Sequence, residues 1–561
     1  MKKISTSKNI IWVFRTFDKS VLSTVILFLL HTVLSVSMIC IALVLRQILD
    51  SAKNYNKMGF KNACVFLVVI IVLRILFATL CRYLDEFLNS KVEINFRYKM
   101  FSMLMYKDYA MVTEIHNAEW MNRLVTDTNT VAGGLTGLIP NFGAVCIKII
   151  AAMISLMLIN EEFVYIIIAS LILLSVVTVL SRSSLKEYHN DIRKKDGKSR
   201  IYMQERLDNF IIVKAFGAEH SSIEGLTSLL CDFRDSRLKR NRISVLCYTI
   251  FSLISFGLYA YGAISCGKGI FDGTMSAGDF TAAIALISQF IAPIGTISSF
   301  IPKYYAMSAS AQRLRNIESL ADDNTELIFD KDKAEAKYSN FDSLNFKNVS
   351  FSFGSSDEVI SNFSFKLNKG DFVALCGKSG SGKSTTLRLM MSVLLPKSGE
   401  IYFEGINGVE KLTSEYRKLF SYVPQDNMII SGTVREILCL GLNEHLYDDD
   451  KLVDALKVAC AYDFVFSCND GLDTIVGENG KTFSYGEMQR LAIARAILSD
   501  RKILLLDEVT SALDEETEVT VLNNIRHLED KTVVLVSHRR TATEMCNMTV
   551  RIGNNEKNCS I

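Results

Sequence analysis

The stretch GKSGSGKSTTLRLMMSVLL, Gly377 to Leu395, decides how the second half of the chain folds. It fits the pattern G-x-x-x-x-G-K-[ST], in which backbone N–H groups of a glycine-rich turn surround phosphate oxygens. The apolar run DFVALC precedes the turn and has the composition of a buried parallel strand, and a helical pattern follows the turn. Strand, turn and helix together predict the phosphate-binding loop of an α/β nucleotide-binding domain.

The residue types in this loop indicate its ligand. Lys383 is expected to reach the β- and γ-phosphates, and the Ser384 hydroxyl is a ligand for Mg²⁺. The N-terminus of the following helix adds positive potential. We therefore expect ATP and Mg²⁺ as cofactors, with ATP in contact with the following residues: Gly377, Lys378, Ser379, Gly380, Ser381, Gly382, Lys383, Ser384 and Thr385.

Two further apolar runs predict neighbouring buried strands that end in chemically active side chains. KILLLDE delivers Asp507 and Glu508, and TVVLVSH delivers His538. The carboxyl ends of parallel strands meet at the edge of a sheet where ligands bind. We expect Asp507 to hold Mg²⁺, Glu508 to act as general base on the attacking water, and His538 to contact the γ-phosphate.

Apolar residues are distributed unevenly along the chain. They make up 49% of its 561 residues and concentrate before about residue 302. A membrane-spanning helix needs about 20 apolar residues. Six stretches qualify: Val21–Leu45, Ala63–Leu80, Leu135–Ile159, Phe163–Leu180, Ser244–Gly267 and Phe280–Ile301. The second and third spans, and the fourth and fifth, are separated by more than fifty residues each. These connections are polar overall with few glycines, which predicts long helices that project from the membrane.

Positive charge predicts the orientation of these spans. Fourteen Lys or Arg residues lie between 182 and 242, whereas the short connection between spans three and four has none. The positive-inside rule therefore places the long connections, the N-terminus and the nucleotide-binding domain in the cytoplasm of a multi-pass protein of the cell membrane. Four basic residues oppose this assignment, and the larger asymmetry outweighs them: Arg46, Lys53, Lys57 and Lys61.

Charge and cysteine spacing argue against other classes of protein. The net charge of +2 gives no reason to expect nucleic acid as a partner. The thirteen cysteines form no C-x-x-C pair and no Cys/His cluster with the local spacing of a zinc site. We therefore expect neither a disulfide framework nor a metal site among the cysteines.

The order of the motifs resembles that of the ATP-binding cassette (ABC) transporters. VPQDN and GLDTIVGENG come after the phosphate loop, then GKTFSYGEMQRLAIARA and LLLDE, and finally SALD and VSH. This ordered set is far more specific than a phosphate loop alone. The membrane half resembles the exporter-type branch, in which six spans precede one cassette, and ERLDNFIIVKAFGAE, Glu205 to Glu219, resembles its second cytoplasmic coupling region.

The resemblance implies the fold class and the domains. We expect an α-helical membrane domain with six transmembrane helices of the exporter-type ABC fold at residues 1–320, a linker at 321–340 and an α/β P-loop ABC ATPase domain at 341–561. Such a chain is a half-transporter. Its functional unit contains a second chain, and two ATP molecules bind between the two cassettes.

The resemblance also assigns roles to individual residues. Gln425 would take part in catalysis and in holding Mg²⁺, and Asp514 would communicate between the two ATP sites. Phe353 would stack on adenine, although it is also interpretable as an ordinary core residue of its strand. Glu478 would face the coupling helices.

The function implied by the resemblance is ATP-driven export by alternating access. ATP that binds a closed pair of cassettes more tightly than an open pair shifts the population towards closure, and the membrane cavity then opens outward. Hydrolysis resets the cycle. Two alternatives stay open: an importer with the exporter fold, for example of a metal chelate, and a membrane-anchored regulatory ATPase.

The signature motif departs from the family pattern LSGGQ. Ser484 and Gly486 retain the groups that hold a γ-phosphate across the dimer, whereas Tyr485 adds bulk and Glu487 adds negative charge. We expect both changes to weaken this contact in trans without abolishing it. The pattern favours a homodimer with two altered sites, and a heterodimer with one degenerate site remains possible.

Three basic residues lie within the predicted spans: His31, Arg74 and Lys148. Intramembrane charge is expensive and predicts a functional site. Arg74 has the alternative of extending to the membrane surface, and His31 that of bonding a neighbouring helix. Lys148 is the candidate for contact with the transported substrate, and it would favour an anionic or amphipathic cargo.

Overall fold

The computed structural model describes residues 6–16, 20–323, 336–353, 357–426, 429–442, 447–477, 483–509, 512–528 and 530–552. Most of the predicted linker and Glu478 therefore lie outside the described residues. The chain divides into two units, the first with residues 1–102 and 118–319 and the second with residues 103–117 and 320–561. Each unit is described by itself.

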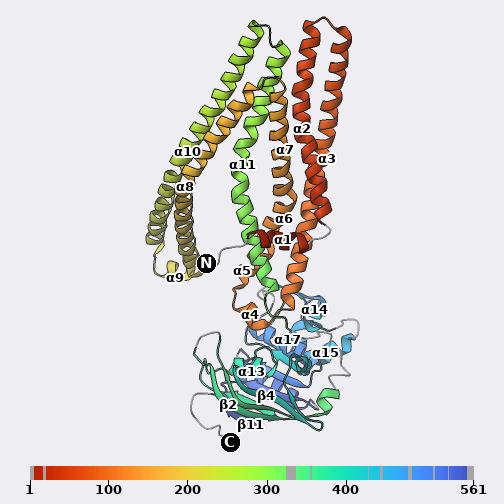
Figure 1. Cartoon of the computed structure of the whole chain (residues 1–561). Helices are drawn as coiled ribbons and strands as arrows, with labels where there is room; N and C mark the ends of the chain where they lie inside the picture. Colours follow the sequence, from red (N-terminus) through yellow and green to blue (C-terminus); the bar gives the residue numbers. More distant parts are fainter. Residues whose placement is uncertain are drawn as a thin grey trace. The chain divides into compact units, whose positions relative to one another are not determined.

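The first unit consists of helices (Figure 1). Six of them hold all or most of each predicted span: α2 (Ser20–Lys53), α3 (Lys57–Met105), α7 (Ile139–Met157), α8 (Glu162–Asp208), α10 (Glu219–Phe271) and α11 (Ala277–Glu318). Shorter helices complete the unit: α1 (Thr6–Thr16), α5 (Asn117–Asn122), α6 (Thr128–Gly133) and α9 (Phe210–Ala215), with π-helical turns at Arg123–Asp127 and Gly134–Leu138. The third predicted span begins in the second of these π-helical turns.

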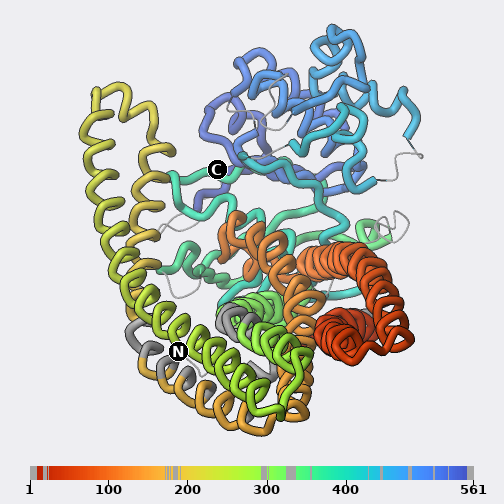
Figure 2. Tube along the Cα trace, turned by 90° about the horizontal axis from the view of Figure 1, so that it is seen from above, coloured from red at the N-terminus to blue at the C-terminus, as the bar shows by residue number. Residues whose placement is uncertain are grey.

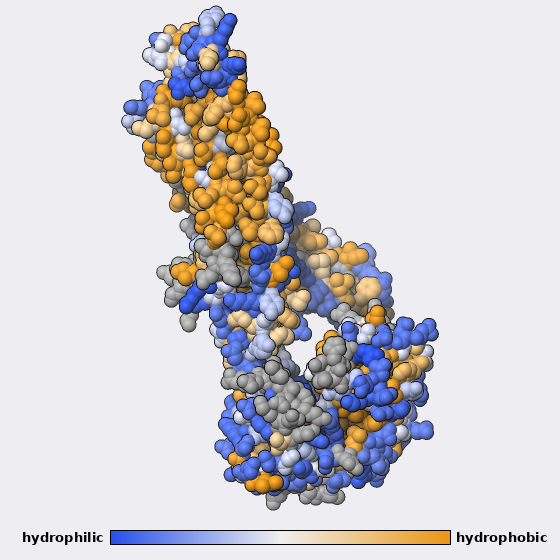
Figure 3. All heavy atoms as spheres, turned by 90° about the vertical axis from the view of Figure 1, so that its right-hand side faces the viewer, coloured by the Kyte–Doolittle hydropathy of each residue, from blue (hydrophilic) through white to orange (hydrophobic). Residues whose placement is uncertain are grey.

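Hydropathy identifies most of the spans within the described residues. Four helical stretches are long and apolar enough to cross a membrane: Thr24–Lys53, Lys57–Met105, Asn117–Met157 and Glu219–Phe271. The remaining two predicted spans fall in α8 and α11, where several side chains lie outside the described residues. Figure 3 shows a broad apolar surface along the helices of this unit. On α3 this surface includes Phe66, Val68 and Leu76, which are 55%, 60% and 61% exposed, as lipid-facing side chains are.

The predicted connection between the fourth and fifth spans is helical over most of its length. α8 and α10 continue well beyond their apolar segments and run side by side (Figures 1 and 2). Lys195 Nζ on α8 donates a hydrogen bond to Ser236 Oγ on α10 at 2.7 Å, and Ser236 Oγ donates to Asp191 on α8. These polar contacts join the extensions where apolar packing is sparse.

The second unit contains two main sheets. The antiparallel sheet has the order β2-β1-β4-β5, the parallel sheet has the order β11-β3-β10-β9-β6, and β7 and β8 form a small pair. The strands are β1 (Phe341–Phe351), β2 (Ile360–Asn368), β3 (Phe372–Cys376), β4 (Ser398–Gly405), β5 (Gly408–Lys411), β6 (Phe420–Val423), β7 (Gly432–Thr433), β8 (Ile475–Val476), β9 (Ile503–Asp507), β10 (Thr532–Val536) and β11 (Met548–Arg551). The helices are α4 (Tyr109–Thr113), α13 (Lys383–Met390), α14 (Val434–Leu438), α15 (Asp449–Val458), α16 (Tyr462–Phe466), α17 (Tyr485–Leu498), α18 (Glu515–Arg526) and α19 (Arg540–Glu544).

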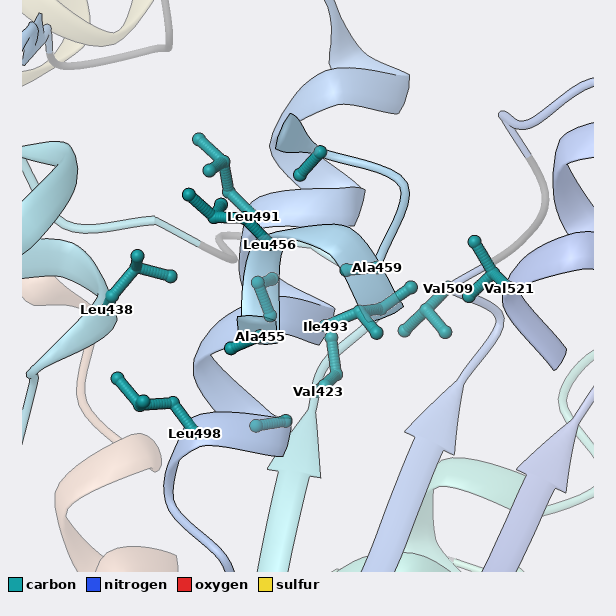
Figure 4. Packing of buried hydrophobic residues seen from close by; sticks show 14 of the residues in the cluster. Val423, Leu438, Ala455, Leu456, Ala459, Leu491, Ile493, Leu498, Val509 and Val521 are labelled. Carbon is teal, nitrogen blue, oxygen red and sulfur yellow. The ribbon is translucent and has the colours of Figure 1, made fainter. Parts of the chain in front are cut away.

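The parallel sheet separates two hydrophobic cores. Alternate residues of β9 belong to different cores: Leu504 and Leu506 pack with the helices α14, α15 and α17, whereas Ile503 and Leu505 pack with the antiparallel sheet. Figure 4 shows the first of these cores, in which the ends of the strands meet the helices. Burial on both faces explains why this strand is a continuous apolar run in the sequence.

The short helix α4 belongs to the second unit although its residues lie between two membrane helices in the sequence. Asp108 N donates to Ala321 O at 3.0 Å, and Lys107 Nζ donates to Asp322 Oδ1 at 2.6 Å. Ala110 packs against the core of the antiparallel sheet. The second unit therefore consists of two separate segments of the chain: the one that contains α4, and the one that follows α11.

Candidate functional site

The phosphate loop joins β3 to α13 as the sequence predicts. Gly380 and Gly382 have φ angles of +80° and +95°, in a region that side chains with a Cβ rarely adopt. Gly382 is the residue that caps α13, so the helix begins at Lys383 with its backbone N–H groups directed towards the loop. A glycine-rich turn that ends at a helix N-terminus is the geometry that binds phosphate.

Two polar side chains of the loop fit an anionic ligand. Lys383 is only 5% exposed, and its Nζ donates to Gly377 O at 3.1 Å and to Lys378 O at 3.3 Å. Ser381 Oγ is buried and has no hydrogen-bond partner within the described part of the chain. A buried polar atom without a partner is costly unless a ligand supplies one. The loop therefore suits the phosphates of ATP.

Asp507 and Ser384 meet at the ends of β9 and the phosphate loop. Ser384 Oγ donates to Asp507 Oδ1 at 3.1 Å, and Tyr422 Oη donates to Asp507 Oδ2 at 3.0 Å. Burial raises the pKa of Asp507, and these two hydrogen bonds oppose the shift. Hydroxyl and carboxylate oxygens are the ligands that Mg²⁺ prefers, so these side chains fit the ion that the sequence predicts.

Glu508 lies at the centre of the predicted catalytic group. Its Oε2 accepts a hydrogen bond from Gln425 Nε2 at 2.8 Å, while its Oε1 lies 3.3 Å from His538 Nε2 and 3.9 Å from Lys383 Nζ. Glu508 adopts a φ of +51°, and its backbone N–H donates to Val536 O on β10. A residue with a Cβ pays a conformational cost there, and the turn directs the carboxylate towards the phosphate loop. All four predicted catalytic residues are thus brought together.

Phe353 follows β1 and is 44% exposed. Its ring packs against Phe351 edge-on, with ring centroids 4.9 Å apart. Phe351 is buried and supports the ring of Phe353, which remains available to a ligand. This exposure favours adenine stacking over the alternative interpretation of Phe353 as a core residue.

The signature residues form the N-terminus of α17. Ser484 caps this helix: Ser484 Oγ accepts from Glu487 N at 3.4 Å, and Ser484 N donates to Glu487 Oε2 at 2.6 Å. This is a capping box. The carboxylate of Glu487 therefore accepts the hydrogen bond of the Ser484 N–H. It also places negative charge at the end of the helix that would hold the γ-phosphate of the ATP bound by the partner.

Tyr485 contacts its own chain rather than extending freely from the helix. Its hydroxyl donates to Gln425 O at 2.9 Å and to Asp426 Oδ1 at 3.3 Å. Because the side chain of Gln425 bonds Glu508, a continuous chain of hydrogen bonds connects the signature helix to the catalytic carboxylate within one cassette. Gly486, the next residue, lies close to Ala512 O, which a Cβ at this position would approach to 3.0 Å.

Asp514 caps α18, where its side chain accepts from Thr517 N at 3.0 Å. These backbone contacts hold its pKa below the ordinary value. Arg539, next to His538, donates to Leu513 O and to the buried Glu518, both at 2.8 Å. The residue predicted to communicate between ATP sites is therefore fixed beside the loop that carries His538.

Three contributors were missed by the sequence reasoning. Tyr422, Asp426 and Arg539 are next to predicted motifs, but their roles depend on partners that are 85, 59 and 21 residues away in the sequence. In β6, Tyr422 lies between two buried neighbours, Ser421 and Val423, and no local sequence pattern indicated its contact with Asp507.

Lys148 lies in the membrane unit on α7 and is half-buried. No hydrogen bond or ion pair involves it within the described residues, and its electrostatic neighbour is Arg74 on α3. Arg74 does not extend to the membrane surface: its Nη1 donates to Leu34 O and to Ser37 Oγ, both at 2.6 Å. His31 bonds Asp85 on the neighbouring helix, one of the two expectations for this residue.

A phosphate loop and facing carboxylates on one unit, together with a six-helix membrane unit, define an ATP-driven membrane transporter. Residues 24–294 match the ABC transporter transmembrane region, and residues 360–511 match the ABC transporter family. The chain belongs to the ABC transporters. It is a half-transporter of the exporter type whose ATPase activity is coupled to transport, which confirms the predicted fold class and family.

Two named proteins and one solved structure are similar to most of this chain. The ATP-dependent lipid A-core flippase of Pasteurella multocida is 28% identical over 508 residues, which cover 89% of this chain and 85% of the relative. ABC transporter B family member 1 of Dictyostelium discoideum is 27% identical, and the match covers 90% of this chain and 55% of that relative. A bacterial Atm1-family ABC exporter with ATP bound has the same fold, with a TM-score of 0.77, 22% identity and coverage of 96% and 94%.

Proposed function

We propose that this transporter exports an anionic amphiphile across the cell membrane, with its N-terminus and nucleotide-binding domain in the cytoplasm. The cargo class rests on two cations of α3 and α7. Arg74 is held by two hydrogen bonds, and Lys148 is half-buried, has Arg74 as its electrostatic neighbour and has no acidic partner in the described structure. Two cations in an apolar domain are stabilised by an anion between them. The lipid A-core flippases among the relatives support a lipid-like cargo.

Within each cassette, the chain itself supplies the residues that act on the attacking water and on the phosphates. Glu508 takes a proton from the attacking water, and Gln425 and His538 orient the carboxylate through the contacts at 2.8 and 3.3 Å. Lys383 stabilises charge on the phosphates. Ser384, Gln425 and Asp507 would hold Mg²⁺, which neutralises charge on the β- and γ-phosphates when it is bound.

A second chain is part of the proposed unit. The helix α9 within the predicted coupling region exposes apolar side chains: Phe210 and Ile211 are 54% and 79% exposed, and Phe216 after it is 82% exposed. Exposed apolar groups of this size mark an interaction surface. The resemblance to the ABC transporters also assigns the signature to the ATP site of a partner cassette. We propose a homodimer, because Glu508 and His538 are retained; a heterodimer is the alternative.

Restoring the signature distinguishes these two assemblies. In a homodimer, replacing Tyr485→Gly and Glu487→Gln should raise the rate of ATP hydrolysis about 5-fold, because a negative charge leaves the helix end that faces the phosphate. ATPase assays on the purified chain, with its mass measured by light scattering, give the answer. In a heterodimer, the altered signature completes an already inactive site, so the rate should hardly change.

Tyr485→Phe is the matched control for this experiment. It removes the hydrogen bonds to Gln425 and Asp426 but retains the bulk of the ring. If Tyr485→Phe already accelerates hydrolysis, the effect comes from the release of Gln425 within one cassette. No change in Tyr485→Phe, with acceleration in the double variant, would assign it to the contact between cassettes.

The cargo class is tested at Lys148. We expect Lys148→Ala to abolish stimulation of ATP hydrolysis by short-chain phosphatidic acid while basal hydrolysis continues, because the anion loses its unpaired cation. Lys148→Arg should retain most of the stimulation. Lys91→Ala, which removes an exposed lysine from α3, is the control and should respond as the unaltered protein does.

The assay must distinguish stimulation by the acyl chains of the lipid from stimulation by its negative charge. Phosphatidylcholine with the same acyl chains should stimulate less than phosphatidic acid in the unaltered protein. Equal stimulation by both lipids, unaffected by Lys148→Ala, would reject an anionic cargo and leave ATP-driven export intact.

A further inference from the structure

Three side chains of metal-ligand type converge between α2 and α3. His31 Nε2 lies 3.2 Å from Asp85 Oδ1, and Cys81 Sγ lies 3.6 Å from His31 Nε2 and 3.8 Å from Asp85 Oδ2. Their ligand atoms all lie within 4.8 Å of one another. Cys81 and Asp85 are four residues apart and therefore share one face of α3, while His31 approaches from α2. The two helices run side by side (Figures 1 and 2).

Two of these separations agree with the edges of a zinc coordination tetrahedron. With bonds of about 2.0–2.1 Å to nitrogen, 2.0–2.2 Å to oxygen and 2.3 Å to sulfur, tetrahedral angles place N and O about 3.3 Å apart, and sulfur about 3.5–3.6 Å from either. His31 Nε2 lies 3.2 Å from Asp85 Oδ1 and 3.6 Å from Cys81 Sγ, whereas the 3.8 Å separation joins Cys81 Sγ to the other carboxylate oxygen, Asp85 Oδ2. An ion therefore fits between the three side chains once the Asp85 carboxylate turns to present a single oxygen to it.

We propose that His31, Cys81 and Asp85 form a binding site for a divalent transition-metal ion, with Zn²⁺ as the best match. Imidazole, thiolate and carboxylate are the ligands that zinc takes in proteins, whereas Mg²⁺ and Ca²⁺ prefer oxygen alone. Binding replaces the hydrogen bonds of the cluster. The Cys81 thiol releases its proton to solvent as its sulfur becomes a ligand, and water completes the fourth position.

The surroundings of the cluster suit a bound ion. Cys81 is 2% exposed, and the side chains of His31 and Asp85 are 16% and 35% exposed. The sulfur is protected from solvent, while the carboxylate side is open enough for an ion to enter. Since His31 lies fifty residues before Cys81, the local spacing that identifies most zinc sites is missing, and the sequence argued against one.

A bound ion would add a further link between α2 and α3. Arg74 already joins these helices through Leu34 O and Ser37 Oγ. An ion that binds only the folded arrangement stabilises it by mass action. Zn²⁺ is therefore expected to raise the midpoint of thermal unfolding of the full chain, and a chelator should reverse the effect.

Cobalt provides the direct test. The chelator-treated full chain in nanodiscs is titrated with Co²⁺ and then with Zn²⁺. We expect a thiolate-to-cobalt absorption band with intense tetrahedral d–d bands, at one ion per chain, and loss of both on addition of Zn²⁺. Cys81→Ser should remove the thiolate band and weaken Zn²⁺ binding at least about 100-fold, since even outer contacts of a metal site contribute 10–100-fold.

Matched variants separate this site from other thiols. Cys64→Ser removes another cysteine of α3 and should leave the spectrum and the affinity unchanged. His31→Gln should weaken Zn²⁺ binding by a similar factor as Cys81→Ser while basal ATP hydrolysis shows that the chain is folded. An octahedral cobalt spectrum, or the same Zn²⁺ affinity in Cys81→Ser and the unaltered chain, would overturn the proposal.

Discussion

Replacing Glu508→Gln should lower the rate of ATP hydrolysis by about 10²–10⁴-fold, the usual contribution of a general base. The substitution is isosteric, and the amide still has an oxygen that accepts from Gln425 Nε2, which now donates to Glu508 at 2.8 Å. ATP binding should persist because the phosphate loop is unchanged. Single-turnover hydrolysis and equilibrium binding of a fluorescent ATP analogue measure the two effects separately.

Rapid ATP hydrolysis by Glu508→Gln would contradict the role of Glu508 as the general base. If hydrolysis continues at more than a tenth of the original rate, the water is activated by another group and Glu508 is not the base. Glu544→Gln, an exposed carboxylate on α19 that pairs with Arg540, is a matched control and should hydrolyse ATP normally.

Replacing the neighbouring residue, Asp507→Asn, should produce a different defect. We expect hydrolysis to fall by at least about 10²-fold, together with loss of its dependence on Mg²⁺, because the ion loses its charged ligand. Folding should survive: Asp507 is 1% exposed, and the neutral amide avoids the cost of a buried charge. Titration of activity and nucleotide binding with Mg²⁺ distinguishes this variant from Glu508→Gln.

The raised pKa of Asp507 adds a pH signature to this prediction. Burial favours the protonated carboxyl, which is a poor ligand for Mg²⁺. As the pH falls, the Mg²⁺ concentration that the unaltered protein needs should therefore rise. This rise should begin at a higher pH than it would for a site with an ordinary aspartate, and extra Mg²⁺ should restore activity. If Asp507→Asn responds to Mg²⁺ as the unaltered chain does, the ion is held elsewhere.

The sequence predicted the parts of the site that depend on local order. The phosphate loop, the strand that ends in Asp507 and Glu508, and the strand before His538 each combine a buried strand with the residues that follow it, so pattern and spacing identify them. The six spans followed in the same way from long apolar runs. These features need no knowledge of distant contacts.

Features that depend on tertiary contacts escaped prediction. The hydroxyl of Tyr485 was expected only to add bulk against a partner, yet it bonds Gln425 O in its own cassette. Glu487 was interpreted as a charge near ATP, and its carboxylate also caps α17. Likewise, the residues at 103–117 lie between membrane helices in the sequence but belong to the unit that contains the cassette.

Transport itself is measured most directly in proteoliposomes that contain the unaltered chain and a fluorescent phosphatidic acid. Added ATP and Mg²⁺ should move the labelled lipid from the leaflet on the nucleotide-binding side to the opposite leaflet, and Glu508→Gln should stop this movement. Reduction of the exposed label by dithionite reports the distribution. Sustained ATP hydrolysis with the same leaflet distribution in the unaltered chain, in Glu508→Gln and without ATP would contradict ATP-driven export of an anionic amphiphile.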